Sequence, residues 1–167
     1  MSGVRTSGGN RLEVRHGRDL EVLLVTGFGS GFIHPGPGTW GSLAALLIWW
    51  FALAGLAWWA QITVIVVTLL LGVWLVARVG RRYGVDDDPS IVVDEFVGLW
   101  LALLAAPLSL PAALAGFALF RVLDIWKPGP VRFAERRAPQ AWGVMLDDVV
   151  AGVLAAGVLQ LSLRLLA

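Results

Sequence analysis

Two pairs of adjacent carboxylates, Asp94-Glu95 and Asp147-Asp148, each stand near the start of a long apolar run in this sequence. Acidic side chains at membrane level are costly, and they are rare unless they are paired, hydrated or bound to a cation. A further acid, Asp124, precedes Lys127 by three residues at the end of another apolar run. If these five carboxylates converge, they form a site for a divalent cation, and their oxygen ligands favour Mg²⁺.

The composition excludes an ordinary soluble protein. The chain has 167 residues, of which 57% are hydrophobic and only 15% are charged, and residues 22–77 contain no Asp, Glu, Lys or Arg. A spanning helix needs about 20 apolar residues, and this stretch is much longer than the apolar core of a cleavable signal peptide. We therefore expect a polar amino-terminal arm at residues 1–21, followed by one helical membrane domain at residues 22–167.

The expected fold class is all-α, a multi-pass membrane protein. The apolar pattern predicts about five helices, at residues 42–56, 62–82, 91–106, 111–126 and 146–165. Residues 26–42 contain six Gly and two Pro, which predicts a loop before the first helix. The Pro residues at positions 107 and 111 bound a tight turn between the third and fourth helices.

Basic residues predict the topology. If the turns near residues 58–61 and 107–111 face outward, every Lys and Arg except Arg164 lies on the other side. The positive-inside rule assigns that side to the cytoplasm. All five candidate carboxylates then lie at the cytoplasmic ends of the helices.

Small residues favour the convergence of these acids. Gly98 follows Asp94 by four residues, and Gly152 follows Asp148 by four. Residues four apart share one face of a helix, and small residues let helices approach closely in lipid. Each acid therefore points toward a side where a neighbouring helix can come near.

Simpler explanations exist for several of these residues. Asp147 and Asp148 could be a helix N-cap and a first-turn acid, an explanation that suits Asp94 and Glu95 less well. The run Asp86–Asp88, next to Pro89, is expected to be a solvated turn.

The basic residues near Asp124 allow two interpretations. Arg121 and Lys127 could hold phosphate oxygens, or they could pair with Asp124 and extend to the interface. In the Gly-rich loop, residues 38–42 (Gly-Thr-Trp-Gly-Ser) stand where a helix is expected to start, and a helix start can bind an anion.

Several chemistries are excluded by residue content. The chain has no cysteine and two histidines, so a thiolate nucleophile is impossible and a zinc site is unsupported. The tripeptide Arg15-His16-Gly17 resembles a histidine-phosphatase signature, but no α/β pattern follows it. A net charge of +1 gives little support to nucleic-acid binding.

Four sequence blocks then give a specific resemblance: TGFGSGFIHPGPGTWGSLAAL, SIVVDEFVGLW, FRVLDIWKPGPVR and GVMLDDVVAGV. Their order and spacing resemble the phosphatidylglycerophosphatase A family, over residues 26 to about 155. The segment His34-Pro35-Gly36 departs from the pattern, and the amino-terminal arm has no match. The resemblance implies a Mg²⁺-dependent bacterial inner-membrane enzyme that converts phosphatidylglycerophosphate to phosphatidylglycerol.

The resemblance also implies that the acids, Lys127 and the turn Pro37-Gly38-Thr39 are functional. The mechanism we expect is metal-assisted hydrolysis of a phosphate monoester. The metal ligands would be Asp94, Glu95, Asp124, Asp147 and Asp148, and the phosphate contacts would be Gly38, Thr39, Ser42, Arg121 and Lys127. Lys127 would also stabilise the reacting phosphate, while Asp94 or Asp148 would accept the proton of water.

Three alternatives stay open from the sequence. An Asp could attack phosphorus directly and form a covalent intermediate. A CDP-alcohol phosphotransferase also has an Asp-rich membrane site, although its characteristic array on one helix is missing. A divalent-cation transporter would carry acids in the middle of its helices rather than at one end. The sequence leaves a homo-oligomer undecided.

Overall fold

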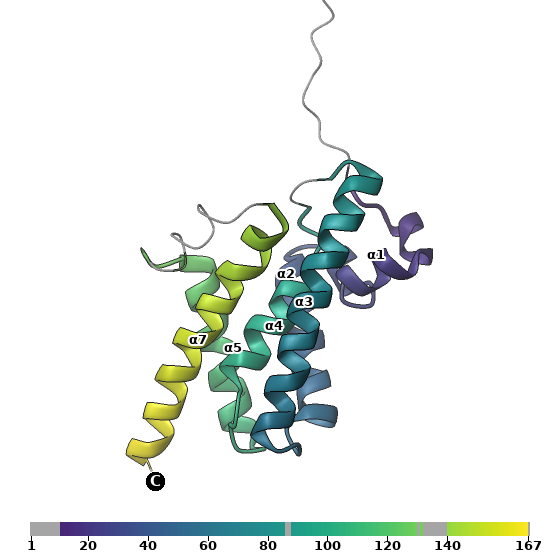
Figure 1. The fold of residues 1–167 in the computed structure, drawn as a ribbon. Coiled ribbons are helices and arrows are strands. Elements are labelled where there is room, and N and C mark those ends of the chain that lie inside the picture. Colours follow the sequence, from purple (N-terminus) through teal and green to yellow (C-terminus); the bar gives the residue numbers. More distant parts are fainter. Residues whose placement is uncertain (1–10, 86–87, 130, 132–139, 167) are drawn as a thin grey trace, which may run out of the picture.

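The computed structural model describes residues 11–85, 88–129, 131 and 140–166, and within these ranges the chain is helical without strands (Figure 1). Short 3₁₀ helices η1 (Val14–Arg18) and η2 (Ser30–Phe32) flank α1 (Leu20–Val25). The longer helices are α2 (Pro37–Ile48), which continues into the π-helical turn η3 (Trp49–Leu53), α3 (Trp58–Tyr83), α4 (Val93–Ala102), α5 (Leu110–Trp126) and α7 (Gln140–Leu166). The all-α prediction is confirmed for this part of the chain.

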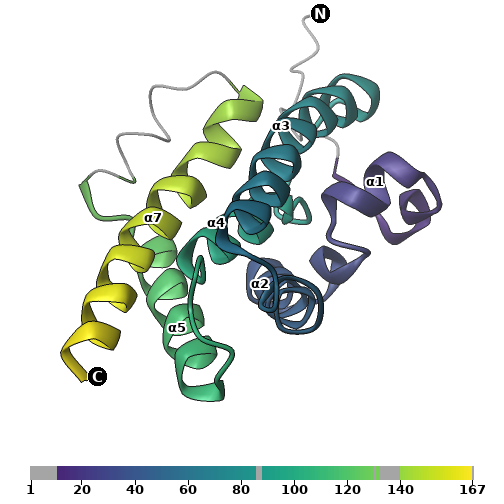
Figure 2. The ribbon, with the colours of Figure 1, turned by 60° about the horizontal axis from the view of Figure 1, so that its bottom comes forward.

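The short helix α4 is the centre of the fold. It packs against α2, α3, α5 and, most extensively, α7, and the other long helices surround it in both views (Figures 1 and 2). Every residue of α4 except Asp94 and Leu101 is buried. A helix that is apolar all round is stable only when its neighbours cover every face. The carboxylates of its first turn are therefore held inside the bundle.

Glycines allow α4 and α7 to touch backbone to backbone. A side chain at Gly152 of α7 would collide with the carbonyl oxygen of Gly98. A side chain at Gly98 would lie 2.8 Å from the carbonyl oxygen of Asp148 and would also collide with the ring of Phe120. The structure therefore confirms that these small residues allow a close approach of helices. The approach brings α4, which carries Asp94, against α7, which carries Asp148.

Buried polar contacts attach the amino-terminal segment to the bundle. Asp88 accepts hydrogen bonds from the backbone N–H groups of Leu12 (2.7 Å) and Ser90 (2.9 Å). The expectation that Asp86–Asp88 is a solvated turn is therefore wrong for Asp88, which is buried; residues 86 and 87 lie outside the described residues.

A second set of contacts joins α1 to the end of α3. Asp19 pairs with Arg82 at 2.6 Å and accepts a hydrogen bond from Tyr83 at 3.0 Å, and Glu21 pairs with Arg78. The pKa of Asp19 lies below its ordinary value, chiefly because its carboxylate accepts the backbone N–H of Glu21. Residues at the end of the predicted polar arm are thus structured and packed against α3.

The helix positions agree with the sequence better than the helix boundaries do. The first predicted helix starts earlier, at Pro37, because Pro suits the first position of a helix. The last one is already helical at Gln140, several residues before the predicted start at 146. By length and composition, two helices can cross a membrane, at Trp58–Tyr83 and Ala141–Leu165. The five-span topology remains a prediction.

The topology can be tested by cysteine labelling, because the chain has no native cysteine. Ala57, before α3, and Arg81, near its end, are both exposed. In right-side-out vesicles, an impermeant thiol reagent is expected to label Ala57→Cys directly and Arg81→Cys only after permeabilisation. Gln61 would be a poor probe for the same purpose, because it is only 3% exposed. The reverse labelling pattern would show that the orientation in the membrane is opposite to the predicted one.

The contact between α4 and α7 can be tested with two matched glycine variants on α7. Gly152→Ala adds a methyl group against the backbone of α4 and is expected to destabilise the protein by about 1–3 kcal/mol, as overpacking does. Gly157→Ala meets nothing within 4 Å and is expected to be neutral or slightly stabilising. Thermal unfolding in detergent micelles compares the two. Equal stability of both variants would contradict the close approach.

Candidate functional site

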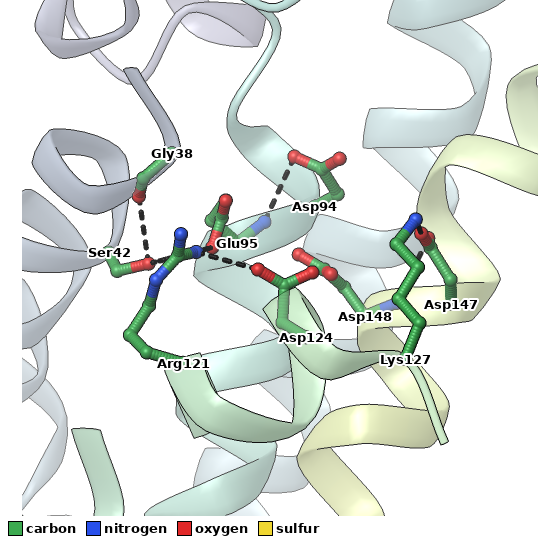
Figure 3. Close-up of polar contacts among 9 residues, drawn as sticks. All are labelled: Gly38, Ser42, Asp94, Glu95, Arg121, Asp124, Lys127, Asp147 and Asp148. Atoms are coloured by element: carbon green, nitrogen blue, oxygen red, sulfur yellow. Dashed lines mark hydrogen bonds and ion pairs between the residues drawn. The ribbon is translucent and has the colours of Figure 1, made fainter. Parts of the chain in front are cut away.

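Carboxylates from three helices meet at one end of the bundle (Figure 3). Asp94 and Glu95 lie in the first turn of α4, Asp124 near the end of α5, and Asp147 and Asp148 in the third turn of α7. Asp148 lies between Asp147 and Asp124, with Asp94 and Glu95 on the neighbouring helix (Figure 3). The structure therefore brings together all five acids that the sequence proposed as metal ligands, although it does not test that role.

The position of these acids reverses one sequence-based interpretation. Asp147 and Asp148 are not an N-cap and a first-turn acid, because α7 is helical from Gln140 onward. Asp94 and Glu95 are the first-turn acids instead, since α4 begins only at Val93. Their charge is favourable beside the partial positive charge of that helix end. Burial of a carboxylate two turns into α7 has no such explanation.

Arg121 joins two of the acids. Its Nη1 atom lies 2.5 Å from Oε2 of Glu95 and 2.8 Å from Oδ2 of Asp124. All three side chains are largely buried. A buried carboxylate is stable when it is paired and hydrogen-bonded, so Arg121 neutralises part of the charge that the convergence creates.

Ser42 of α2 completes this group. Its hydroxyl lies 2.7 Å from Oε2 of Glu95, 2.9 Å from the carbonyl oxygen of Gly38 and 3.3 Å from Nη1 of Arg121. A side chain at Gly38 would collide with Glu95. The first turn of α2 is therefore seated directly against the acids, while Thr39 is exposed at the same helix end. Gly38, Thr39, Ser42 and Arg121, all predicted phosphate contacts, thus lie at the same place.

Lys127 lies on the other side of the cluster. It is the residue that ends α5, with a positive φ of 44°, and its ammonium donates to Oδ2 of Asp147 at 2.8 Å. The sequence had allowed Arg121 and Lys127 simply to pair with Asp124. The structure shows that pairing for Arg121, whereas Lys127 is paired with Asp147 on α7.

Among the described residues, neither Asp148 nor Asp94 forms an ion pair with a basic side chain. One carboxylate oxygen of Asp148, Oδ2, is buried without a hydrogen-bond partner. Asp94 is half-buried, and its Oδ1 atom accepts the backbone N–H of Glu95 at 3.0 Å. An unsatisfied buried carboxylate oxygen costs free energy. It therefore marks a place where a cation or a proton would stabilise the protein.

The residues suit Mg²⁺ chemically but do not form a ready-made cage. Among the described residues, no three acidic or histidine side chains lie close enough together to enclose a metal ion. The donors are nonetheless all carboxylate oxygens, one of them unsatisfied, and Mg²⁺ commonly takes one or two carboxylates and completes its shell with water and phosphate. The site fits such a loosely held ion better than a structural metal.

One partnership in the site was not visible in the sequence. Ser42 and Glu95 are 53 residues apart, and their contact depends on how α2 crosses α4. The same crossing is held by Trp100, whose indole N–H donates to the carbonyl oxygen of Ala45 at 2.9 Å. The sequence signals for this approach were Gly38 and Gly41, where a side chain would collide with Glu95 and Val92 respectively.

Comparisons with known proteins identify a family. The family model described as phosphatidylglycerophosphatase A matches residues 23–163. Phosphatidylglycerophosphatase A of Escherichia coli (strain K12) is 44% identical over 138 residues, which cover 82% of this chain and 80% of the relative. The protein of the same name from Haemophilus influenzae is 45% identical over 134 residues, or 80% of this chain and 82% of the relative.

A third relative has a different name. It is a putative phosphatidylinositol-3-phosphatase of Bacteroides thetaiotaomicron, 44% identical over 142 residues, which cover 80% of this chain and 87% of that protein. No solved structure matches the chain significantly. The resemblance carried by the four sequence blocks is confirmed, and the names of the relatives share one feature, a phosphate group on a membrane lipid.

The pairing between Arg121 and Glu95 can be measured by a double-mutant cycle. Arg121→Gln leaves two buried carboxylates without their cation and is expected to cost about 3 kcal/mol in the free energy of unfolding. Glu95→Gln should cost less in that background than in the wild type. Arg81→Gln, at an exposed arginine, is the control and should change stability little. Strictly additive costs for Arg121→Gln and Glu95→Gln would show that the two side chains are not coupled.

Proposed function

Because this chain belongs to the phosphatidylglycerophosphatase A family, we propose that it removes the terminal phosphate of phosphatidylglycerophosphate, with Mg²⁺ as cofactor, to give phosphatidylglycerol. It is a hydrolase of phosphoric monoesters, as the names of its relatives indicate. The observation that carries the proposal is the cluster of five carboxylates beside Arg121, Lys127 and the start of α2. That combination can hold a cation and a phosphate group next to each other.

The membrane setting supports a lipid substrate. Two helices are long and apolar enough to cross a bilayer. The end of α3, whose sequence carries Arg78, Arg81 and Arg82, lies at the same end of the bundle as the start of α7 and the end of α5 (Figure 1). We propose that this end faces the cytoplasm of a bacterial inner membrane, as the distribution of basic residues indicates. A phospholipid headgroup would then meet the cluster at the membrane surface.

In the mechanism we propose, the carboxylates that would hold Mg²⁺ are among Asp94, Glu95, Asp124, Asp147 and Asp148. When bound, the ion supplies Lewis-acid stabilisation of the phosphate oxygens. Asp148 would be the leading ligand, because its buried Oδ2 atom has no hydrogen-bond partner. Glu95 and Asp124 share Arg121, which keeps their oxygens aimed into the cluster while it offsets their repulsion.

The remaining groups act on water and phosphate. Asp94 is half-buried and is not paired with a basic side chain in the described part of the chain, so it can meet a water molecule and accept its proton as the water oxygen attacks phosphorus. The bond between phosphorus and the glycerol oxygen breaks, and the proton passes to that oxygen as the alcohol leaves. Lys127 and the exposed hydroxyl of Thr39, at the start of α2, would bind the non-bridging phosphate oxygens.

Phosphate release by the purified protein tests this proposal. Wild-type protein with Mg²⁺ is expected to hydrolyse phosphatidylglycerophosphate, and EDTA should abolish turnover until Mg²⁺ is restored. Phosphatidylinositol 3-phosphate, the lipid in the name of one relative, is the comparison substrate and should be hydrolysed more slowly. Faster hydrolysis of that lipid would change the assigned substrate, and full activity in EDTA would refute the metal requirement.

Matched variants link this activity to the cluster. Asp94→Asn and Asp148→Asn change charge with little change in volume and should each lower kcat by roughly 10²-fold or more, the range for a lost acid–base group. Glu13→Gln removes a carboxylate from the exposed residue that precedes η1 and should leave kcat unchanged. Asp87, in the run that the sequence predicted to be a solvated turn, lies outside the described residues and is therefore not used as the control. Equal losses in all three variants would show that the cluster has no special role.

A further inference from the structure

A cavity of about 240 Å³ lies on the side of α4 away from the acid cluster. Its walls come from the segment 24–28, the end of α2, the middle of α3 and the first two turns of α4. The α4 residues in its wall are Val93, Phe96 and Trp100, and Asp94 and Glu95 lie between the first two of these. One short helix therefore carries the carboxylates on one face and the wall of an apolar cavity on another.

Only hydrocarbon suits this cavity. Thr68 is the one polar side chain among its described lining residues, apart from the indole of Trp100. The indole N–H already donates to the carbonyl oxygen of Ala45. A water molecule needs two or more polar partners, and apolar cavities of this kind stay dry or bind apolar molecules. An apolar chain of matching width is the occupant that the lining favours.

The mouth of the cavity opens where lipid chains are available. Leu71 of α3, in its wall, is 46% exposed on the most apolar candidate membrane span. Phe28 also lines it and is 63% exposed. Because these two lining side chains are exposed, a neighbouring lipid chain can reach the cavity from the side.

Phe28 has a strained backbone conformation at this mouth. Its φ is 58°, between Gly27 at 55° and Gly29 at 87°. A non-glycine residue in the left-handed region costs about 1 kcal/mol or more, and such residues often lie at ligand clamps. The hydrogen bond from the N–H of Phe28 to the carbonyl oxygen of Leu23, at 2.8 Å, maintains this conformation. The unfavourable backbone conformation of Phe28 is therefore maintained by the fold, and it holds the aromatic ring at the mouth of the cavity.

We propose that this cavity holds an acyl chain of the phospholipid that is being hydrolysed, a proposal that rests on the function proposed above. An α-helix with its side chains is about 10 Å wide. In phosphatidylglycerophosphate, a phosphodiester and a second glycerol separate the acylated glycerol from the terminal phosphate. That spacer lets the headgroup pass over the amino-terminal end of α4, with the chain on one side of the helix and the phosphate on the other.

The expected role of the cavity is to orient the substrate. A chain that leaves the bilayer for the cavity gains little hydrophobic free energy, because lipid is as apolar as the lining. A held chain instead fixes where the headgroup lies relative to the acids, and a near-attack position is worth large factors in rate. Blocking the cavity should therefore slow hydrolysis of a lipid but not of a substrate without chains.

Two matched variants on α3 test this role. Thr68→Phe fills the cavity, and Val67→Phe adds the same ring at a neighbouring exposed position outside it. For a substrate with long acyl chains, Thr68→Phe should lower kcat/KM about tenfold, while Val67→Phe changes it less than twofold. For glycerol 3-phosphate, both variants should match the wild type. Equal activity of Thr68→Phe and Val67→Phe on the lipid would overturn the proposal.

A second measurement does not depend on the Thr68 variant folding. Phosphatidylglycerophosphate with a diazirine in its acyl chain is photolysed in the presence of the Asp94→Asn variant. This variant keeps the native cavity and is expected to hydrolyse the lipid only slowly. We expect peptides from the cavity wall, around residues 68–75 and 93–100, to be labelled, and to be labelled more than by phosphatidylethanolamine with the same chain. Equal labelling by both lipids would indicate a structural lipid instead, and absence of label there would refute an acyl-chain site.

The two proposals fail in different ways. If the wild type releases phosphate from neither the lipid nor glycerol 3-phosphate, the proposed function is wrong, whatever the labelling shows. If the wild type hydrolyses the lipid but the cavity is neither labelled nor sensitive to Thr68→Phe, only the acyl-chain site is wrong.

Discussion

The contact between Gly98 and Gly152 is the constraint on which the site depends. A side chain at either position would push α4 and α7 apart, and the carboxylates of both helices lie one turn before these glycines. Close approach of the backbones therefore sets the separation of Asp94 and Asp148. Because interiors are densely packed, no other residue type could keep this spacing. The chemistry proposed for the acids rests on the absence of two side chains.

That approach creates an electrostatic cost, and the surrounding residues offset part of it. Arg121 bridges Glu95 and Asp124, and Lys127 pairs with Asp147. The cations are fewer than the carboxylates, and one buried oxygen of Asp148 has no partner. A buried charge without a partner is unfavourable. The remaining negative charge is thus the physical reason that the site is suited to a divalent cation.

Helix α4 separates two environments over a single helix width. One face, with Asp94 and Glu95, belongs to the polar cluster, and the other, with Val93, Phe96 and Trp100, lines an apolar cavity. A phospholipid has the same two-part character, with a charged head and hydrocarbon chains. Because the neighbouring helices fix the position of α4, this helix can keep the headgroup and an acyl chain of one lipid at a constant separation.

The all-helical class, the approximate positions of the helices, the family and the set of acids that converge could all be predicted from the sequence, because each of these is encoded locally. Apolar runs show helices, and four ordered blocks show the family. The helix ends were less predictable: α7 starts well before Asp147, and α4 starts just before Asp94, since tertiary packing rather than propensity sets such limits.

The burial of Asp88 and the contact between Ser42 and Glu95 could be seen only in the folded structure. It alone paired Lys127 with Asp147 and placed an apolar cavity behind the acids. These features join residues far apart in the chain, and their geometry depends on how whole helices cross, which no local pattern specifies.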